Sequence, residues 1–244
     1  LQYDLDYNIS PNFGLDVPME QISKGNGGSC VLSAYSSSVI NLSNHLTTSL
    51  GITAQYFTLN KNWTVEPRAA LKWSFNPKHA LALAYGLHSR REKLDYYFVE
   101  QEANGKTESN RYLDFSKAHH FGLTYDWNIN SYMHLKVEPY YQYLFRIPVE
   151  ENSSFSIINH QSFYLDRILK NRGSGVNYGI DITLEQYMKN GFYYMITASL
   201  FKSKYKAGDN IWRNTRLDKN YLLNILAGKE WMGGRNKQNV LSLN

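Results

Sequence analysis

The sequence predicts an all-β fold, an antiparallel transmembrane β-barrel in which about 11 strands are present of a barrel of about 22. Three observations predict it: apolar and polar side chains alternate, the alternating segments are long, and short turns are separated by long loops. No segment approaches the roughly 18 consecutive apolar residues that a membrane-spanning helix requires. Alternation instead lets a strand present one face to lipid and the other to water.

The segment 132–147 shows the alternation best. Successive side chains of a strand point to opposite faces. One face carries Met133, Leu135, Val137, Pro139, Tyr141, Tyr143 and Phe145, and the other carries His134, Lys136, Glu138, Tyr140, Gln142 and Arg146. At ~3.3 Å per residue this strand reaches roughly 50 Å, against roughly 20 Å for an ordinary strand. Such a length is typical of the wall of a large barrel.

The first strands follow from the same pattern. Residues 1–9 alternate from the first position, and a long connection, 10–29, ends in a Gly25-Asn26-Gly27-Gly28 turn cluster. The segment 30–42 is the weakest prediction, because three consecutive serines blur its two faces. Residues 45–59 alternate clearly. After a turn at 60–62, the strand 63–75 has an apolar face of Trp63, Val65, Pro67, Ala69, Leu71, Trp73 and Phe75.

The later strands are predicted in the same way. One starts at His79 and runs toward Val99, a polar loop follows at 100–117, and the next strand covers 118–129. Pro148 is expected to end the strand 132–147. Further strands are expected at 176–185, 192–206, 217–232 and from 240 onward.

The connections fall into two groups. Those near 41, 77, 130, 190 and 234 are short, whereas 10–29, 100–117 and 148–174 are long, with the turn at 60 as an exception. Outer-membrane barrels have tight periplasmic turns and long extracellular loops. Because both ends of the sequence still alternate and no signal peptide precedes the first strand, we expect residues 1–244 to be a partial barrel, with a plug domain, N-terminal strands and last strands absent.

The amino-acid composition limits the classes of molecule that the protein can bind. The chain is 43% hydrophobic and 15% aromatic, with 20 Tyr, and Tyr and Trp settle at membrane–water interfaces. Its 26 Lys and Arg give a net charge of +5 but are scattered, which argues against nucleic acid and favours anionic lipid phosphates. The single cysteine, Cys30, excludes an internal disulfide.

A set of short segments from residue 54 onward resembles, in the same order, the later barrel strands of TonB-dependent outer-membrane receptors. The segments are Glu66-Pro67-Arg68, 85–89, His119-His120, 138–144, Pro148-Val149-Glu150, 177–185, 199–205, 212–215 and 224–230. They look most like the branch whose members begin with a carboxypeptidase-regulatory-like domain.

The resemblance implies a receptor, not an enzyme, in the outer membrane of a Gram-negative bacterium. It implies uptake of a scarce nutrient, such as a ferric chelate, cobalamin, an oligosaccharide or a peptide, driven by the inner-membrane proton-motive complex. The implied partners are outer-membrane lipid and lipopolysaccharide, the protein's own plug domain, and TonB through the absent N-terminal region. No cofactor is implied.

Five residues are candidates for ligand binding. His88 and Arg90 lie where a strand is expected to reach the extracellular end, and Arg146 ends the polar face of 132–147. Trp212 and Arg213 follow an expected extracellular loop, where an aromatic ring beside a guanidinium suits stacking on a sugar or chelate. Solvated rim residues, interstrand ion pairs and an interface anchor are the plainer interpretations of these side chains.

Two other classes of function remain open. An outer-membrane barrel protease would use His119, His120 and Asp126, but adjacent residues of a strand face opposite ways, so the two histidines cannot easily share a metal or a substrate. Asp126 also lies near a short turn, away from the expected outer mouth. A passive porin or adhesin is the third class. No catalytic residue and no metal site is predicted.

Overall fold

A computed structural model describes residues 2–9, 20–103, 105–162, 164–233 and 239–243. The described chain has no α-helix, and its strands are β1 Gln2–Ile9, β2 Glu20–Gly28, β3 Val31–Asn41, β4 Leu46–Phe57, β5 Asn62–Asn76, β6 His79–Arg90, β7 Glu100–Ala103, β8 Lys106–Ser109, β9 Ser116–Asn130, β10 Met133–Val149, β11 Lys170–Lys189, β12 Phe192–Lys206, β13 Trp212–Asn214, β14 Tyr221–Gly233 and β15 Asn239–Leu243. Three short 3-10 helices, η1 Leu94–Phe98, η2 Asn110–Tyr112 and η3 Ile157–Asn159, lie in the connections. No helix among the described residues has the length and apolar character needed to cross a membrane.

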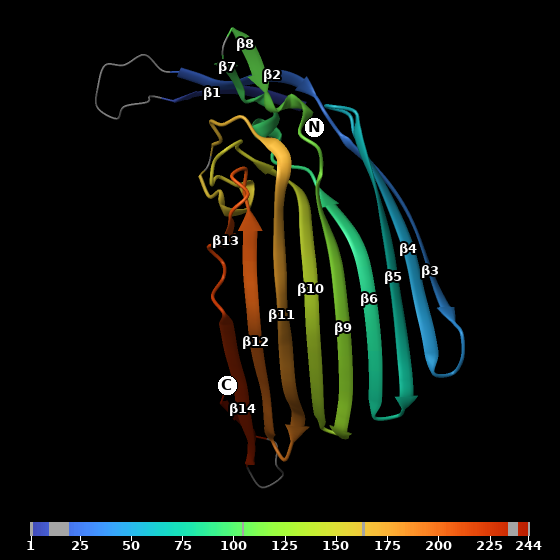
Figure 1. The fold of residues 1–244 in the computed structure, drawn as a ribbon. Helices are drawn as coiled ribbons and strands as arrows, with labels where there is room; N and C mark the ends of the chain where they lie inside the picture. The colour runs from blue at the N-terminus through green and yellow to red at the C-terminus, as the bar shows by residue number, and fades with distance from the viewer. Residues whose placement is uncertain (1, 10–19, 104, 163, 234–238, 244) are drawn as a thin grey trace.

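An 11-stranded antiparallel sheet forms the body of the molecule (Figure 1). Its strand order is β15-β14-β12-β11-β10-β9-β6-β5-β4-β3, with β13 beside β12, and the sheet is open at both edges. Strands of this sheet pair with their neighbours in the chain, except that β6 pairs with β9 across the separate β7–β8 hairpin and β14 pairs with β12 beyond the short β13. The short connections after β3, β5, β9 and β11 lie together at the lower end, and the long ones lie at the upper end (Figure 1). This arrangement confirms the predicted all-β, antiparallel fold and the segregation of the loops.

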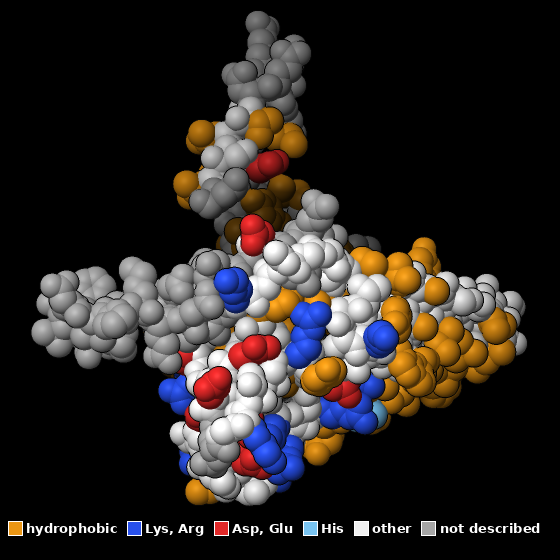
Figure 2. Space-filling model, turned by 90° about the horizontal axis from the view of Figure 1, so that it is seen from above, with side chains coloured by type: hydrophobic (Ala, Val, Ile, Leu, Met, Phe, Trp, Pro, Cys, Tyr) orange, Lys and Arg blue, Asp and Glu red, His pale blue; other side chains and the backbone are white. Residues whose placement is uncertain are grey.

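The two faces of the sheet differ as the alternation predicts. Leu83, Tyr141 and Tyr178 are 57%, 44% and 42% exposed, although they belong to central strands. Tyr140 and Gln142 lie on the opposite face, on which polar side chains bond across the strands. Seen from above, charged side chains gather over the loop end, whereas hydrophobic side chains cover a flank (Figure 2). A sheet with one apolar and one polar surface is what a barrel wall requires.

The N-terminal prediction was wrong in its placement. The strand expected at 1–9 is present as β1, but it pairs with β2 in a two-stranded sheet beyond the upper end of the wall (Figure 1). The connection predicted as a loop at 10–29 contains β2, while residues 10–19 lie outside the described residues. Alternation of apolar and polar residues predicts a strand with two different faces, but it does not predict which sheet that strand joins.

Three boundaries also differ from expectation. β6 ends at Arg90 instead of running toward Val99, because Tyr96, Tyr97 and Phe98 are all buried and a 3-10 turn points them into one core. The predicted loop 100–117 contains the β7–β8 hairpin and η2. β10 continues through Pro148 to Val149, beyond a bulge at which Arg146 has φ of 54°.

The bounds of some C-terminal strands also differ from the prediction. β11 is longer than the predicted 176–185, because its first residues are buried beneath the preceding loop and so lack alternation. β12 matches the prediction at 192–206. The strand predicted at 217–232 is present as β14, which begins later, at Tyr221, and β13 is an additional short strand that lies before the predicted range.

The long loops at the upper end share a hydrophobic core. Its buried members are Phe57, Tyr96, Tyr97, Phe98, Val99, Leu113, Phe115, Ile147, Ile157, Leu165 and Leu169. Asn110 is 1% exposed at its centre and joins two loops: its Nδ2 donates to the Arg167 carbonyl at 2.8 Å, and its Oδ1 accepts from the Leu169 amide at 2.7 Å. The connections 91–115 and 150–169 therefore form one packed unit over the end of the sheet.

Candidate ligand-binding site

A row of polar and small residues crosses the inner face of the sheet, one per strand. Members of the row lie directly opposite one another in register: Ser37, Gly51, Arg68, Gly86, His120, Gln142, Asn177 and Ser203. Asn177 Nδ2 donates to Gln142 Oε1 at 3.1 Å, and Ser203 Oγ donates to Asn177 Oδ1 at 2.7 Å. The row therefore presents hydrogen-bonding groups to the interior at one level.

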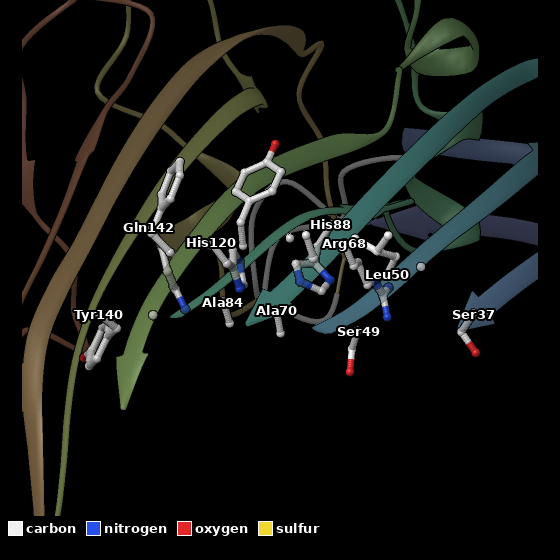
Figure 3. Close-up of a pocket in the computed structure, with 16 residues that line it drawn as sticks. Ser37, Ser49, Leu50, Arg68, Ala70, Ala84, His88, His120, Tyr140 and Gln142 are labelled. Atoms are coloured by element: carbon white, nitrogen blue, oxygen red, sulfur yellow. The ribbon is translucent and has the colours of Figure 1, made fainter. Parts of the chain in front are cut away.

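The residues next to this row are small. Ser49, Ala70, Ala84 and Gly122 follow one another in register on the same face, ending at Tyr140. Together with the polar row they line a concave depression of about 510 Å³ (Figure 3). Small side chains leave this part of the wall hollow, so another molecule or domain can approach the backbone closely.

His88 and His120 stand at the upper border of this depression (Figure 3). They come from neighbouring strands β6 and β9, and their ring centres are 4.5 Å apart. His88 Nε2 lies over Gly86, where a Cβ would come within 2.7 Å of it. The absence of a side chain at Gly86 therefore lets the two imidazoles approach each other.

A buried carboxylate fixes the wall beside the histidines. Glu66 is 2% exposed and accepts hydrogen bonds from Gln55 Nε2 at 2.6 Å, from Arg68 at 3.1 Å and from the Ser89 hydroxyl. β5 and β6 pair only from Arg68 and Gly86 downward, so Glu66 bridges the part where their ladder has ended. Its contacts replace the missing backbone pairing in this region.

Above the histidines, a larger cavity of about 1330 Å³ opens between the sheet and the loops. His88 and His120 line both cavities, so the two are adjacent. Of its described lining residues, four are Lys or Arg and one is a carboxylate: Arg90, Arg91, Lys93 and Lys117 against Glu92. The cavity therefore has a positive potential that favours an anionic ligand.

The single carboxylate of this cavity is occupied by contacts within the protein. Glu92 is 5% exposed and accepts from the Ser116 hydroxyl at 2.5 Å, while Arg90 lies 3.7 Å from its other oxygen. Arg90 itself keeps a side chain that is 74% exposed. Lys93 Nζ lies 5.6 Å from the centre of the Tyr96 ring. The exposed guanidinium and ammonium are thus available to a ligand.

The roof of the cavity is rigid on its upper side. Tyr97, next to the lining residue Tyr96, is 1% exposed, and its hydroxyl accepts from the Glu92 amide at 3.2 Å. Burial raises the pKa of Tyr97 to about 12. The ring therefore stays neutral and packed in the loop core at physiological pH.

Of the five predicted ligand residues, His88 and Arg90 are brought together at this cavity. Arg146 lies elsewhere: its guanidinium is 2.5 Å from the Asp114 carboxylate, and its bulge turns it away from the polar row. Arg213 makes a bidentate ion pair with Asp209, in which the nitrogen–oxygen distances are 2.9 and 2.5 Å. Arg146, Trp212 and Arg213 therefore do not form one site with His88.

The residues considered for a protease are also apart. His119 stacks on Phe145 and bonds to Tyr85 on the outer face, whereas His120 faces the interior. Asp126 lies toward the short-turn end and contacts His134 Nε2 at 3.2 Å. Within the described part of the chain, no group of three or more His, Cys, Asp or Glu is placed to hold a metal ion.

Several lining residues escaped prediction. Lys93, Tyr96 and His160 belong to segments that the sequence pattern assigned to a strand or a loop, and they meet only through the loop core. The dipeptide Arg90-Arg91 next to Lys93 was the one local signal, a cluster of positive charge at a strand end.

The sheet has the fold of part of an outer-membrane β-barrel. The Escherichia coli K12 ferric-catecholate import receptor Fiu aligns over 90% of this chain and 34% of its own, with a TM-score of 0.63 and 9% identity. The Pseudomonas aeruginosa ferripyoverdine receptor aligns over 93% and 29%, with a TM-score of 0.62 and 9% identity. The Bordetella pertussis alcaligin receptor FauA aligns over 84% and 35%, with a TM-score of 0.56 and 13% identity.

These matches cover about a third of each receptor, so the chain corresponds to part of a barrel. At such low identity they show a common fold. No protein-family model and no curated protein matches the sequence.

Proposed function

We propose that this chain is part of the barrel of a TonB-dependent receptor that imports a scarce nutrient across the outer membrane of a Gram-negative bacterium. The main support is the basic cavity at the end where the long loops gather, within a sheet whose fold matches such receptors. The carboxypeptidase-regulatory-like branch, a plug domain, TonB and lipopolysaccharide are the partners and relatives that the sequence resemblance implies.

In this function the cavity receives the ligand from outside. Arg90 and Lys93 attract an anionic group at the mouth of the cavity. The polar row and the hollow of small residues below lie on the path toward the interior. A ferric chelate with negative charge or an acidic oligosaccharide has the size and charge for the upper cavity.

Uptake by the full-length protein in its native outer membrane tests this function. Labelled ferric chelates, cobalamin, oligosaccharides and peptides are offered to cells with and without the gene, in the presence or absence of a protonophore. Gene-dependent uptake that the protonophore abolishes is expected, because transport draws on the proton-motive force. Uptake that continues with the protonophore indicates a passive porin and contradicts the proposal.

Charge reversal locates the site. Arg90→Glu with Lys93→Glu places two negative charges in the cavity and should weaken ligand binding by at least tenfold. Lys106→Glu, on the exposed β7–β8 hairpin and outside the cavity lining, is the matched control. Equal affinity in both variants would exclude this cavity as the ligand site.

A further inference from the structure

Two histidine rings meet at the border between the depression and the upper cavity. His88 comes from β6 and His120 from β9, both rings face the interior, and their centres are 4.5 Å apart (Figure 3). A Cβ at Gly86 would lie 2.7 Å from His88 Nε2 and 3.4 and 3.5 Å from the two ring carbons beside it, so this nitrogen points at the position that Gly86 leaves empty. Gly86 stands directly opposite His120 in the ladder. The His88 imidazole therefore reaches the level of His120, although its backbone lies two residues higher.

The ring nitrogens of this histidine pair are available to a ligand. Both rings are half-buried, and within the described parts of the chain neither one makes a hydrogen bond to a side chain or to the backbone. Other histidine rings of the sheet and loops do have such a partner: His79, His119, His134 and His160. Neutral imidazole nitrogen is the commonest metal ligand in proteins. Two unpartnered imidazoles side by side are therefore placed to share one metal ion.

The distance between the two rings fits two adjacent positions of a metal ion. A metal bound about 2.0–2.1 Å from an imidazole nitrogen lies roughly 3.2 Å from the centre of that ring. With ring centres 4.5 Å apart, two such bonds meet at an angle of about 90° at the metal. Adjacent positions of a square-planar or tetragonal ion are about 90° apart, whereas those of a tetrahedral ion are about 109° apart. The spacing therefore suits Cu²⁺ or Ni²⁺ better than Zn²⁺.

The surroundings of the histidine pair tolerate a cation and leave space for its other ligands. Arg68, which stands opposite Gly86 on the other side, is neutralised by the Glu66 carboxylate at 3.1 Å. A Cβ at Gly122, two residues below His120, would meet nothing within 4 Å. No third His, Cys, Asp or Glu among the described residues completes a metal site. The remaining donors therefore have to arrive with the metal.

We propose that His88 and His120 bind a divalent transition-metal ion of the Cu²⁺ or Ni²⁺ type, presented by an anionic chelator that leaves two adjacent positions of the metal open. This inference rests on the proposed uptake function and names the class of ligand that the cavity receives. Arg90 and Lys93 attract the negative charge of the chelator, and the imidazoles then take the open positions on its metal. A metal ion that its own chelator encloses completely gains nothing from the pair.

Electron paramagnetic resonance of Cu²⁺ tests the site in the full-length protein, purified from outer membranes in detergent. The probe is the 1:1 complex of Cu²⁺ with glycine, which leaves two adjacent positions open. The native protein should give a tetragonal Cu²⁺ signal whose pulsed spectrum reports two equatorial imidazoles. His88→Gln and His120→Gln should each remove one imidazole and weaken Cu²⁺ binding by about 100-fold or more, because loss of a group that only orients a metal ligand already costs about 10–100-fold.

His79→Gln and His119→Gln, whose rings bond to tyrosines on the outer face, are the matched controls and should keep both imidazoles and the native affinity. Cu²⁺ enclosed by EDTA should not bind. The proposal is overturned if the native protein lacks the two-imidazole signal, if either inner-face variant retains it, or if the EDTA complex binds as tightly as the glycine complex. Cu²⁺ should also raise the unfolding temperature of the native protein and not that of His88→Gln, which separates loss of the metal ligand from loss of folding.

Uptake by the native protein distinguishes failure of this inference from failure of the proposed function. Protonophore-sensitive import of a nutrient, together with the absence of the two-imidazole signal, refutes the metal site alone. The two-imidazole signal without protonophore-sensitive import of any nutrient refutes the proposed function and leaves a metal site in a protein of another class.

Discussion

Asn110 is expected to hold the two outer loops together. Its side chain is 1% exposed, donates to the Arg167 carbonyl and accepts from the Leu169 amide. Asn110→Ala leaves both backbone groups buried without a partner. Each such group costs about 1–3 kcal/mol, so the change should lower the free energy of opening the 150–169 loop by about 2–4 kcal/mol when partial relaxation is allowed.

Amide hydrogen exchange at Leu169 measures this opening directly. A loss of about 2–4 kcal/mol corresponds to exchange roughly 30-fold to several hundredfold faster. Asn110→Asp keeps an acceptor for the Leu169 amide but puts a buried carboxylate against the Arg167 carbonyl oxygen, so it should be at least as destabilising as the alanine variant. Asn159→Ala, outside the loop core, should affect Leu169 little.

The reasoning is refuted if Leu169 exchanges at the native rate in Asn110→Ala while the protein remains folded. It is also refuted if Leu169 exchanges at the native rate in the aspartate variant, because a buried carboxylate that faces a carbonyl oxygen must loosen the loop. In the proposed receptor, a loosened 150–169 loop should also weaken ligand binding, since Ile157, Ile158 and His160 line the upper cavity.

Three further predictions follow. Gly179→Ala should reduce the fraction of protein that stays folded in detergent, because its Cβ would lie 2.5 Å from the Leu200 carbonyl oxygen and 3.0 Å from the Tyr140 hydroxyl. Gly122→Ala is the control, since a Cβ there meets open space. Equal folded fractions of the two variants would contradict this packing. Burial raises the pKa of Tyr97 to about 12 from a usual value of about 10, so the folded loop core is favoured at lower pH and loses this contribution as pH rises from about 10 to 12. Protease cleavage within 91–115 should therefore increase over that range in the native protein and less in Tyr97→Phe; identical profiles would disprove the assignment. The Arg213 guanidinium lowers the pKa of the Asp209 carboxyl, so the 209–213 turn should keep its conformation until pH falls below the ordinary aspartate range. Trp212 fluorescence should report the change of conformation at that acid pH, and Asp209→Asn should abolish it. A fluorescence change that persists in Asp209→Asn would rule out the ion pair as its cause.

The sequence predicted the parts of the fold that two-residue periodicity controls. β5 and β10 were located because apolar and polar side chains alternate along consecutive residues of both strands. β12 was located to the residue for the same reason. β1 alternates equally well, so the local pattern placed it wrongly in the wall, whereas β2 lacks alternation and was predicted as part of a loop.

Segments buried on both sides gave no such signal. Gly173, Ser174 and Gly175 at the start of β11 are covered by the loop above them, and Tyr96 to Val99 all enter the loop core. The site was predictable in part: the alternation placed His88 and Arg90 on a strand that leads to the long-loop end, although it did not locate the end of that strand at Arg90. Lys93 and His160 reach the cavity through long-range packing around Asn110, which the surrounding polar sequence does not reveal.

Single cysteines along β10 test the division of the sheet into a lipid face and an aqueous face. In the full-length protein, with Cys30 replaced by serine, a spin label is placed in turn at positions 135 to 142, and its collisions with oxygen and with a water-soluble nickel complex are compared in native outer membrane. Labels at Leu135, Val137 and Tyr141 should meet oxygen preferentially, and labels at Lys136, Glu138 and Gln142 the nickel complex, with a period of two residues. A profile without that period, or with the two sets exchanged, would contradict the barrel wall on which the receptor assignment depends.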